Sequence, residues 1–373
     1  MTRALSISAL EPWLGGSHKR FLDSWQGRSR HQIRVHGQAD RHWKWRMQSG
    51  AWALARELKG PPPDGLLVSD YLDLSRLAAF APAAWRDLPT VVYFHENQLT
   101  YPLAPDEKES ERDFSFGFAN ILSCIKADRV VFNSQFHCDE FRDAAEELLR
   151  RLPRPNPRQE FARAMEDARI IAPGIECEEF ELGAGPQNGN PLRLAFNHRW
   201  EHDKDPEAFL EAALKAQDRG AQFELVLLGE TYQQMPLRAE ALLACVGPQT
   251  VHRGFTKSRA EYGRLLASCD LIVSTARHEF FGMAMLEAMA AGCTPLLPKR
   301  LAYPEVLPDM WHAEGLYESD EDLCQRILQA SQSPEQFREP ARRSSIRKVS
   351  QAYAAATTAS ALDRLWDELC GVP

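Results

Sequence analysis

Short apolar runs alternate with segments of helical spacing along the first half of the chain. The run "GLLVSD" at 65–70, for example, is followed by "YLDLSRLAAF", in which apolar residues recur at helical spacing. Strands that alternate with helices in this way usually pair in parallel, so the pattern predicts an α/β fold with a largely parallel sheet. The expected strands span 4–10, 65–70, 90–97 and 128–134, with a last strand and a turn within 169–180.

The alternation breaks and then restarts. The Arg/Pro segment "RRLPRPNPR" at 150–158 and the Gly/Pro/Asn segment at 183–191 have the composition of loops and linkers. A second set of expected strands follows at 192–199, 223–230, 250–255, 270–275 and 294–298. We therefore expect two Rossmann-like domains that face an interdomain cleft. Their expected bounds are 1–175 for the N-terminal domain, 176–191 for a linker, 192–350 for the C-terminal domain, and 351–373 for a helix packing back toward the N-terminal domain.

Polar residues stand where the expected strands end. In open α/β sheets, ligands bind outside the carboxyl ends of the strands, so these residues are candidate ligand contacts. They are His95-Glu96-Asn97, Asn133-Ser134, Asn197-His198-Arg199, Gly229-Glu230 and Ser274.

The composition is that of a water-soluble globular protein. The chain has 373 residues, 44% hydrophobic and 26% charged, and its apolar runs are too short for a membrane span. The first residues lack the apolar core of a secretory signal, so we expect a cytoplasmic protein. Cys124, Cys269 and Cys293 lie in apolar segments and are expected to be buried free thiols. No His/Cys cluster has zinc-site spacing, so we expect no metal.

The charge is distributed unevenly. The net charge is −8, yet residues 1–59 carry eleven Lys/Arg against four Asp/Glu, which suggests one anionic partner on one face. Within this segment "RHWKWRM" offers cations for backbone phosphates and indoles for stacking on unpaired bases. We call Arg41, Lys44 and Arg46 the N-terminal basic patch. The alternative is a helix start with core tryptophans, which we expect for one of Trp43 and Trp45, because alternate residues cannot share a helix face.

Two further stretches suit phosphate. Gly15 and Gly16 follow an expected strand and open a helix, whose N-terminus favours an anion; a tight turn is the alternative. Arg199 and Lys204 follow a strand and can bracket a diphosphate, unless they are incidental charges of a solvated loop. No P-loop motif and no full G-x-G-x-x-G are present, which disfavours P-loop NTPases and typical dinucleotide enzymes.

The stretch "RHEFFGMAMLEAMAAG" at 277–292 holds two carboxylates around a loop–helix junction. Glu279 is expected in the loop, where it can accept hydrogen bonds from sugar hydroxyls, and Glu287 on the helix, where it can hold a ribose diol. The alternatives are an acid stabilised by the helix dipole for Glu279 and an exposed helix position for Glu287.

The string "EFFGMAMLEAMAAG" resembles the E-x7-E signature of retaining glycosyltransferases of the GT-B fold, family four. The resemblance implies a nucleotide-sugar donor, no cofactor, no metal, and a leaving phosphate that accepts the proton of the acceptor. The catalytic residues it implies are Glu279, Arg199 and Lys204. His95 is a further catalytic candidate, as a contact to the sugar or the acceptor, because it stands at the carboxyl end of an expected strand; a satisfied structural histidine is the alternative. The donor contacts it implies are Gly15, Gly16, Arg199, Lys204, Glu279, Phe281, Gly282, Met283 and Glu287.

The strings "EPWLGGSHK", "RHWKWRMQSGA", "YFHENQLTYP" and "RDFSFGFANILSCIKADRVVFNS" resemble one subgroup, the tRNA-queuosine mannosyltransferases. That resemblance implies GDP-mannose as donor and the cyclopentenediol of queuosine in a tRNA anticodon as acceptor. The expected acceptor contacts are His18, Lys19, Arg41, Trp43, Lys44, Arg46, Glu96 and Asn97. The segment at 150–158 and the acidic "DEKESERD" at 106–113 depart from the pattern on the acceptor side.

Two alternatives stay open from the sequence. One is a retaining glycosyltransferase that acts on a polysaccharide or a glycolipid, which an exposed amphipathic basic helix would favour. The other is a non-catalytic RNA-binding protein on a GT-B fold. The intact set of Glu279, Glu287, Arg199 and Lys204 argues against the second alternative.

Overall fold

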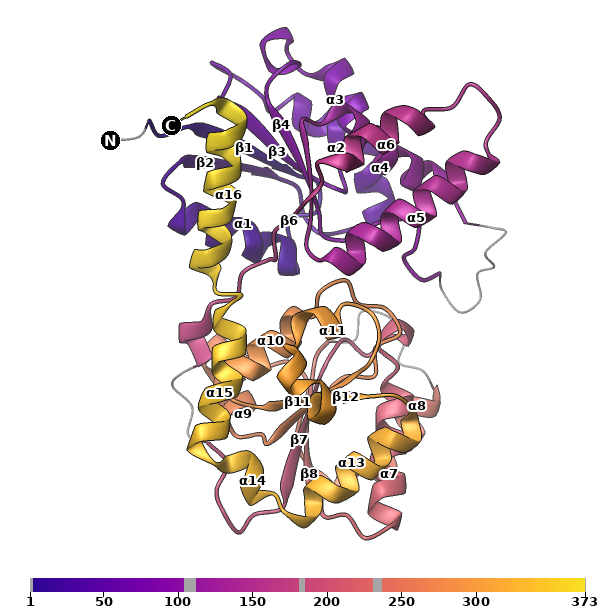
Figure 1. Cartoon of the computed structure of the whole chain (residues 1–373), viewed down its shortest axis with the longest axis vertical. Coiled ribbons are helices and arrows are strands. Elements are labelled where there is room, and N and C mark those ends of the chain that lie inside the picture. The colour runs from indigo at the N-terminus through magenta and orange to yellow at the C-terminus, as the bar shows by residue number, and fades with distance from the viewer. Residues whose placement is uncertain (1–2, 104–111, 181–184, 231–236, 373) are drawn as a thin grey trace. The chain divides into compact units, whose positions relative to one another are not determined.

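The apolar runs of the first half fold as short parallel strands (Figure 1). Residues 66–69 and 91–94 are buried, and both runs are largely apolar on both faces, as expected for a sheet covered on both sides. The computed structural model describes residues 3–103, 112–180, 185–230 and 237–372. It divides the chain into two units, Met1–Gly174 with Ala355–Pro373, and Ile175–Ala354.

The first unit contains a six-stranded parallel sheet of order β2-β1-β3-β4-β5-β6. Its strands are β1 (Ser6–Glu11), β2 (Gln32–Gly37), β3 (Gly65–Ser69), β4 (Thr90–Phe94), β5 (Arg129–Phe132) and β6 (Arg169–Ile170). Strand β2 was not predicted, because it lies at the sheet edge and its polar residues leave only one fully buried position. The order of the strands reverses between β1 and β3, and a crevice for a ligand is expected at such a point.

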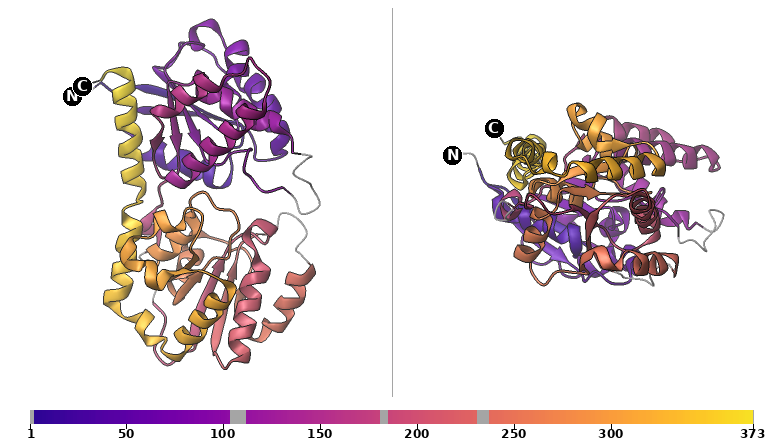
Figure 2. Two further views of the ribbon diagram at one scale, coloured as in Figure 1. Left: turned by 45° about the vertical axis from the view of Figure 1, so that its right-hand side comes forward. Right: turned by 90° about the horizontal axis from the view of Figure 1, so that it is seen from below.

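Helices cover both faces of the first sheet (Figures 1 and 2). One face packs on α1 (Gly16–Arg28) and α16 (Ala355–Cys370), around Trp25 and Trp366. The other packs on the remaining helices, which are α2 (Trp43–Ala55), α3 (Leu74–Phe80), α4 (Phe114–Lys126), α5 (Gln135–Arg151) and α6 (Arg158–Glu166). Helix α16 is therefore part of this unit although it ends the chain, and Trp25 Nε1 donates to its Asp363 at 3.0 Å.

The second unit contains another six-stranded parallel sheet, of order β12-β11-β10-β7-β8-β9. Its strands are β7 (Leu192–Asn197), β8 (Phe223–Leu228), β9 (Thr250–Arg253), β10 (Leu271–Val273), β11 (Thr294–Pro298) and β12 (Leu316–Tyr317). Its helices are α7 (Pro206–Asp218), α8 (Leu237–Cys245), α9 (Arg259–Ala267), α10 (Met283–Ala290), α11 (Tyr303–Val306), α12 (His312–Gly315), α13 (Asp320–Gln332), α14 (Glu335–Arg338) and α15 (Pro340–Gln351). The order reverses between β7 and β10, in the classic Rossmann arrangement.

The prediction of an α/β fold with two Rossmann-like domains is confirmed. The chain leaves the first unit at Gly174, and the 3₁₀ turn Cys177–Phe180 already packs within the second unit, where Phe180 is 1% exposed. Cys124, Cys269 and Cys293 are buried free thiols, as predicted. Among the described segments, every helix falls short of the length or apolar character that a bilayer span requires. Most of the acidic stretch at 106–113 lies outside the described residues.

Candidate functional site

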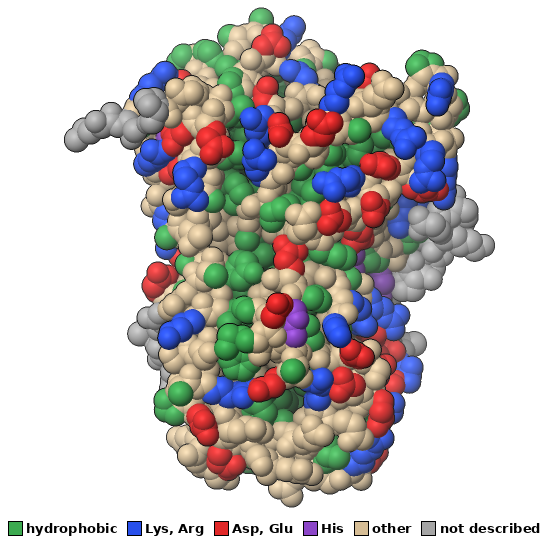
Figure 3. Space-filling view, in the orientation of Figure 1, with side chains coloured by type: hydrophobic (Ala, Val, Ile, Leu, Met, Phe, Trp, Pro, Cys, Tyr) green, Lys and Arg blue, Asp and Glu red, His purple; other side chains and the backbone are tan. Residues whose placement is uncertain are grey.

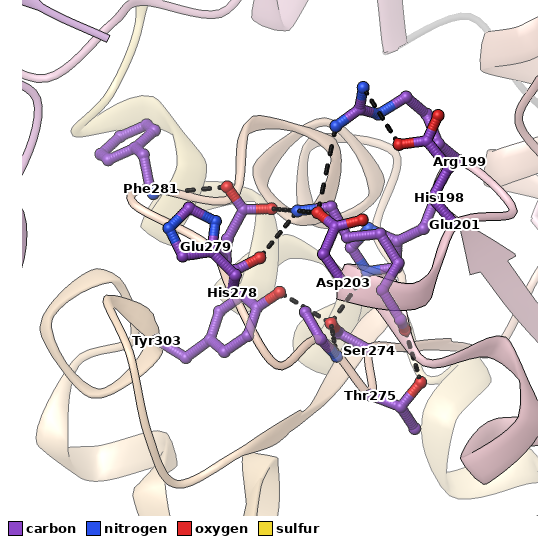
Figure 4. Close-up of polar contacts among 12 residues, drawn as sticks. His198, Arg199, Glu201, Asp203, Ser274, Thr275, His278, Glu279, Phe281 and Tyr303 are labelled. Carbon is purple, nitrogen blue, oxygen red and sulfur yellow. Dashed lines mark hydrogen bonds and ion pairs between the residues drawn. The ribbon is translucent and has the colours of Figure 1, made fainter. Parts of the chain in front are cut away.

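The first candidate site lies at the carboxyl ends of β7 and β10, where the order of the second sheet reverses (Figure 4). Residues 198–205 follow β7 and include the 3₁₀ turn His202–Lys204, while residues 274–282 follow β10. Gly229 lets the first of these loops cross the end of β8. A Cβ at Gly229 would lie 2.0 Å from the His198 carbonyl oxygen, and its φ of +109° also favours glycine.

Lys204 is the centre of this site. Its side chain is 11% exposed, and its Nζ donates to the His278 carbonyl at 2.8 Å and to Glu279 Oε2 at 3.3 Å. It also lies 3.2 Å from Asp203 Oδ2. Burial alone would raise the pKa of Glu279 and of Asp203, but Lys204 holds the pKa of both carboxyls below their usual values. Glu279 is therefore a carboxylate at neutral pH, which accepts but does not donate hydrogen bonds.

Arg199 lies beside the same carboxylates but is more exposed. Its guanidinium is 3.4 Å from Glu201 and 4.0 Å from Asp203, and 41% of its side chain is exposed. Because Arg199 and Lys204 both contact Asp203, the structure brings the two predicted cations together. A solvent-accessible guanidinium beside a buried ammonium is a suitable site for a diphosphate.

Two buried histidines complete the site. Burial, reinforced by Lys204, lowers the pKa of His198 and of His278 to about 4, so both imidazoles are neutral at neutral pH. His198 Nε2 is 2.8 Å from Ser274 Oγ, which is 2.7 Å from the Tyr303 hydroxyl (Figure 4). His278 was not singled out from the sequence, although it directly precedes Glu279.

Helix α10 carries the second half of the stretch at 277–292. Glu279 lies in the loop before the helix, as predicted, and its Oε1 accepts from the Phe281 N–H at 3.4 Å. Gly282 caps the helix with a φ of +96°, which glycine adopts without strain. Phe281 is buried and packs edge-on against Tyr353 at 5.6 Å, whereas Met283 is half-buried.

Glu287 is a buried residue, not an exposed helix position. It is 3% exposed, its Oε1 accepts from Arg259 at 2.9 Å, and its Oε2 accepts from the Tyr262 hydroxyl at 2.6 Å. Tyr262 in turn accepts from Asn197 Nδ2 at 2.6 Å, which ties helix α10 to the end of β7. Arg259 and Tyr262 were missed from the sequence because no motif marks them.

A second cluster lies at the carboxyl ends of β1 and β3 in the first unit. His18 Nδ1 is 3.0 Å from Glu11 Oε2, and the His18 ring lies tilted against the His95 ring with centroids 4.0 Å apart. Burial lowers the pKa of His18, but attraction to Glu11 and the hydrogen bond with it outweigh this and raise the pKa to about 9. Burial and His18 hold the pKa of His95 well below its usual value. Among the described residues, Glu11, His18 and His95 also offer metal-ligand atoms within 4.8 Å of one another.

Other predicted contacts of the first unit are placed differently. Gly15 and Gly16 open α1, but the carboxylate of Asp40 occupies the space beside Gly15, 2.0 Å from where a Cβ would stand. Lys19 pairs with Asp23 one turn along the helix. Asn97 is 0% exposed and builds its own turn, accepting from the Leu99 and Thr100 N–H groups. Glu96 is half-buried and accepts from Tyr71.

The N-terminal basic patch lies at the start of α2. Trp43 packs on Phe116 with centroids 5.6 Å apart, whereas Trp45 is 63% exposed, so one indole is a packing residue, as predicted. Arg41 and Lys44 are exposed, and Arg46 donates to the Ala39 carbonyl at 3.0 Å. On the face drawn in Figure 3, Lys and Arg side chains are interspersed with Asp and Glu side chains.

Comparisons with known proteins divide the chain into two parts close to the two units of the structure. Residues 6–175 match the family model "tRNA-queuosine alpha-mannosyltransferase N-terminal", and residues 179–344 match "Glycosyl transferases group 1". The chain is 33% identical over 347 residues to a tRNA-queuosine alpha-mannosyltransferase of Drosophila melanogaster, which covers 89% of this chain and 88% of the relative. It is 26% identical over 255 residues to a GDP-mannose-dependent alpha-(1-6)-phosphatidylinositol dimannoside mannosyltransferase of Mycobacterium tuberculosis, covering 66% of this chain and 59% of that protein.

Solved structures share the whole architecture. Sucrose-phosphate synthase from Thermosynechococcus elongatus superposes with a TM-score of 0.72 at 14% identity, covering 99% of this chain and 100% of that one. Anabaena Alr3699/HepE in complex with UDP superposes with a TM-score of 0.66 at 16% identity, covering 98% and 100%. At this identity the similarity concerns the fold.

Proposed function

This chain belongs to the tRNA-queuosine alpha-mannosyltransferase family, and from that premise we propose that it transfers mannose from GDP-mannose to the cyclopentenediol of queuosine in a tRNA anticodon, with retention. The chain is a mannosyltransferase with the GT-B fold. The observation that carries the donor half of the proposal is the cluster of Lys204, Glu279 and Asp203 beside the half-exposed Arg199.

The cation pair fits a diphosphate leaving group. As the bond to mannose breaks, negative charge develops on the GDP oxygens, and fixed cations in a partly enclosed site stabilise that charge. Lys204 supplies a buried ammonium whose position is fixed by Glu279 and the His278 carbonyl, and Arg199 supplies a planar fork that binds two oxygens at once. The departing phosphate then accepts the proton of the acceptor hydroxyl.

The carboxylates fit the neutral parts of the donor. Glu279 is ionised and accepts hydrogen bonds from mannose hydroxyls, while its contact with Lys204 keeps it next to the diphosphate. Glu287 accepts from Arg259 and from Tyr262, which fix its carboxylate in place, and its proposed ligand is the ribose diol of the nucleotide. His95, neutral at pH 7, is the proposed contact to the sugar or to the acceptor hydroxyl.

On the acceptor side, the proposed partner is a queuosine-containing tRNA in the cytoplasm. Arg41 and Lys44 of the N-terminal basic patch are exposed and suit backbone phosphates, and the exposed Trp45 suits stacking on an unpaired base. The donor is a substrate, and we propose that the reaction needs no resident cofactor or metal.

The test is mannose transfer itself. The protein is incubated with GDP-mannose and queuosine-containing tRNA, the tRNA is digested, and the nucleosides are analysed by mass. We expect queuosine to gain the mass of one hexose, and to gain nothing when UDP-glucose replaces GDP-mannose or when the tRNA carries guanosine at that position. Queuosine that keeps its mass with GDP-mannose, under conditions in which the Drosophila relative modifies it, would refute the proposal.

A further inference from the structure

Three carboxylates crowd together at the carboxyl ends of β1, β3 and β4. Glu11 is 2% exposed, Asp70 is 1% exposed, and Glu96 is half-buried; we call them the acid cluster. Their electrostatic coupling is direct, because Glu11 and Glu96 both raise the pKa of Asp70. His18 interacts electrostatically with all three carboxylates.

Glu11 is fully satisfied within the protein. Its Oε1 accepts from the Trp13 N–H at 2.9 Å and from the Ser69 hydroxyl at 2.8 Å, and its Oε2 pairs with His18 at 3.0 Å. The positive charge of His18 is therefore paired with the carboxylate of Glu11. Both oxygens of Glu11 are engaged, so it would have to give up these contacts to join His18 and His95 as a metal ligand.

The carboxylate of Asp70 has a hydrogen-bond partner on only one of its two oxygens among the described residues. Its Oδ1 accepts from the His95 N–H at 2.8 Å, but its buried Oδ2 has no hydrogen-bond partner among the described residues. Burial, followed by the charges of Glu96 and Glu11 and only partly opposed by His18, raises the pKa of Asp70 well above its usual value. A buried carboxylate oxygen without a donor is costly, so this position favours a group that brings both a proton donor and a positive charge.

Two aromatic side chains, Tyr71 and Trp13, lie beside members of the acid cluster. Tyr71 donates to Glu96 Oε1 at 2.7 Å and meets the His18 ring edge-on at 5.5 Å. Trp13 stacks on Tyr71 at 5.7 Å. Electron-rich ring faces next to carboxylates are the usual environment for an organic ammonium group.

The acceptor carries such a group. In queuosine the cyclopentenediol is attached through a secondary amine, which is protonated in neutral water, whereas guanosine has no cation at this point. We propose that the acid cluster is the subsite for this ammonium, with Asp70 Oδ2 as the principal acceptor and Glu96 beside it. The inference rests on the proposed function and deepens it, because it identifies the residues that distinguish a queuosine tRNA from a guanosine tRNA.

The test compares two tRNAs that differ only in queuosine or guanosine. Asp70→Asn keeps an oxygen for the His95 N–H and replaces the unpartnered oxygen with an amide donor. We expect wild-type protein to bind the queuosine tRNA more tightly, and Asp70→Asn to lose about 10- to 100-fold of that affinity, the range of a hydrogen bond to a charged group. Its affinity for the guanosine tRNA should not change. Asp87→Asn, which removes an exposed acid of the same unit, should behave as wild type.

The outcomes separate the amine subsite from the enzyme's activity. Two results would overturn the amine subsite and leave the proposed function standing. In one, the wild-type protein transfers mannose but binds both tRNAs equally. In the other, the Asp70→Asn variant still binds the queuosine tRNA more tightly than the guanosine tRNA. A preference that disappears in EDTA and returns with Zn²⁺ would also overturn it, because the cluster would then be a metal site. If thermal unfolding shows that Asp70→Asn does not fold, Glu96→Gln provides the same comparison, with an expected loss of about tenfold.

Discussion

Replacing Lys204 with methionine tests the donor site most directly. Methionine keeps most of the aliphatic length and removes the charge, so the buried part of the side chain remains filled. The variant loses the hydrogen bonds to the His278 carbonyl and to Glu279, and it loses the positive charge 3.2 Å from Asp203. Two separate effects follow, one on turnover and one on stability.

The effect on turnover is the larger one. A fixed donor aimed at charge that develops in the transition state contributes about 3–4 kcal/mol, so we expect kcat to fall about 10²- to 10³-fold. GDP affinity should fall by about 10- to 100-fold, because the diphosphate of GDP loses one charge-assisted hydrogen bond. The loss of stability should stay below the ~3–5 kcal/mol that is typical of a broken buried pair, because Arg199 remains beside Asp203.

The assay measures the initial rate of mannose transfer at saturating GDP-mannose, GDP binding by calorimetry, and thermal unfolding. Lys215→Met is the matched control: Lys215 is exposed on α7, in the same unit, and its loss should leave all three measurements unchanged. The reasoning would be refuted by a folded Lys204→Met enzyme whose kcat stays within tenfold of wild type while Glu279→Gln is inactive.

Three further predictions concern other parts of the chain. Glu287→Gln should weaken GDP binding about tenfold, because one hydrogen bond to a charged group is lost. If calorimetry shows that the variant and wild type bind GDP equally well, Glu287 does not bind the ribose. Alanine at all three positions of the N-terminal basic patch should weaken tRNA binding and flatten its salt dependence, because fewer counterions are released. If the affinities of the variant and of wild type agree at two salt concentrations, the patch has a structural role and does not bind tRNA. The pKa of His18 is raised from 6.5 to about 9, so its pairing with Glu11 adds about 3 kcal/mol to the free energy of unfolding. This stabilisation is fully present below pH 6.5 and is lost as the pH rises through 9. Urea unfolding between pH 6.5 and 9 should show this loss in wild type, and its persistence in His18→Gln would assign it to another group.

The sequence predicts the strands at the centre of each sheet better than those at its edges. A central parallel strand is buried on both faces, so it stands out as an apolar run, as at Gly65–Ser69 and Thr90–Phe94. An edge strand such as β2 needs burial on one side only, and its polar residues hide it. Strand β12 spans Leu316–Tyr317, too short to form a pattern at all.

The same limit applies to the candidate site. Glu279, Arg199 and Lys204 could be predicted because each lies in a recognisable local string next to a strand end. The residues around them could not be predicted. Tyr262 reaches Glu287 from α9, a distant part of the chain, and Asp203, although it directly precedes Lys204, carries no motif of its own. Asp70 was missed for a further reason, since its importance depends on the burial of Oδ2, and burial is a property of the folded unit.

The two strand-order reversals offer a ligand different charged groups, and this has a consequence for specificity. The site between β7 and β10 presents Arg199 and Lys204, which suit an anionic leaving group, whereas the site between β1 and β3 holds the acid cluster, which repels phosphate. A tRNA backbone is therefore unfavourable at the acid cluster, and only a base that carries its own cation gains there. The phosphates would then be attracted elsewhere, so we expect general tRNA affinity to depend on the N-terminal basic patch and recognition of the modified base to depend on Asp70. The two contributions should then be separable by mutation: loss of the patch lowers affinity for every tRNA, while loss of Asp70 lowers it for one.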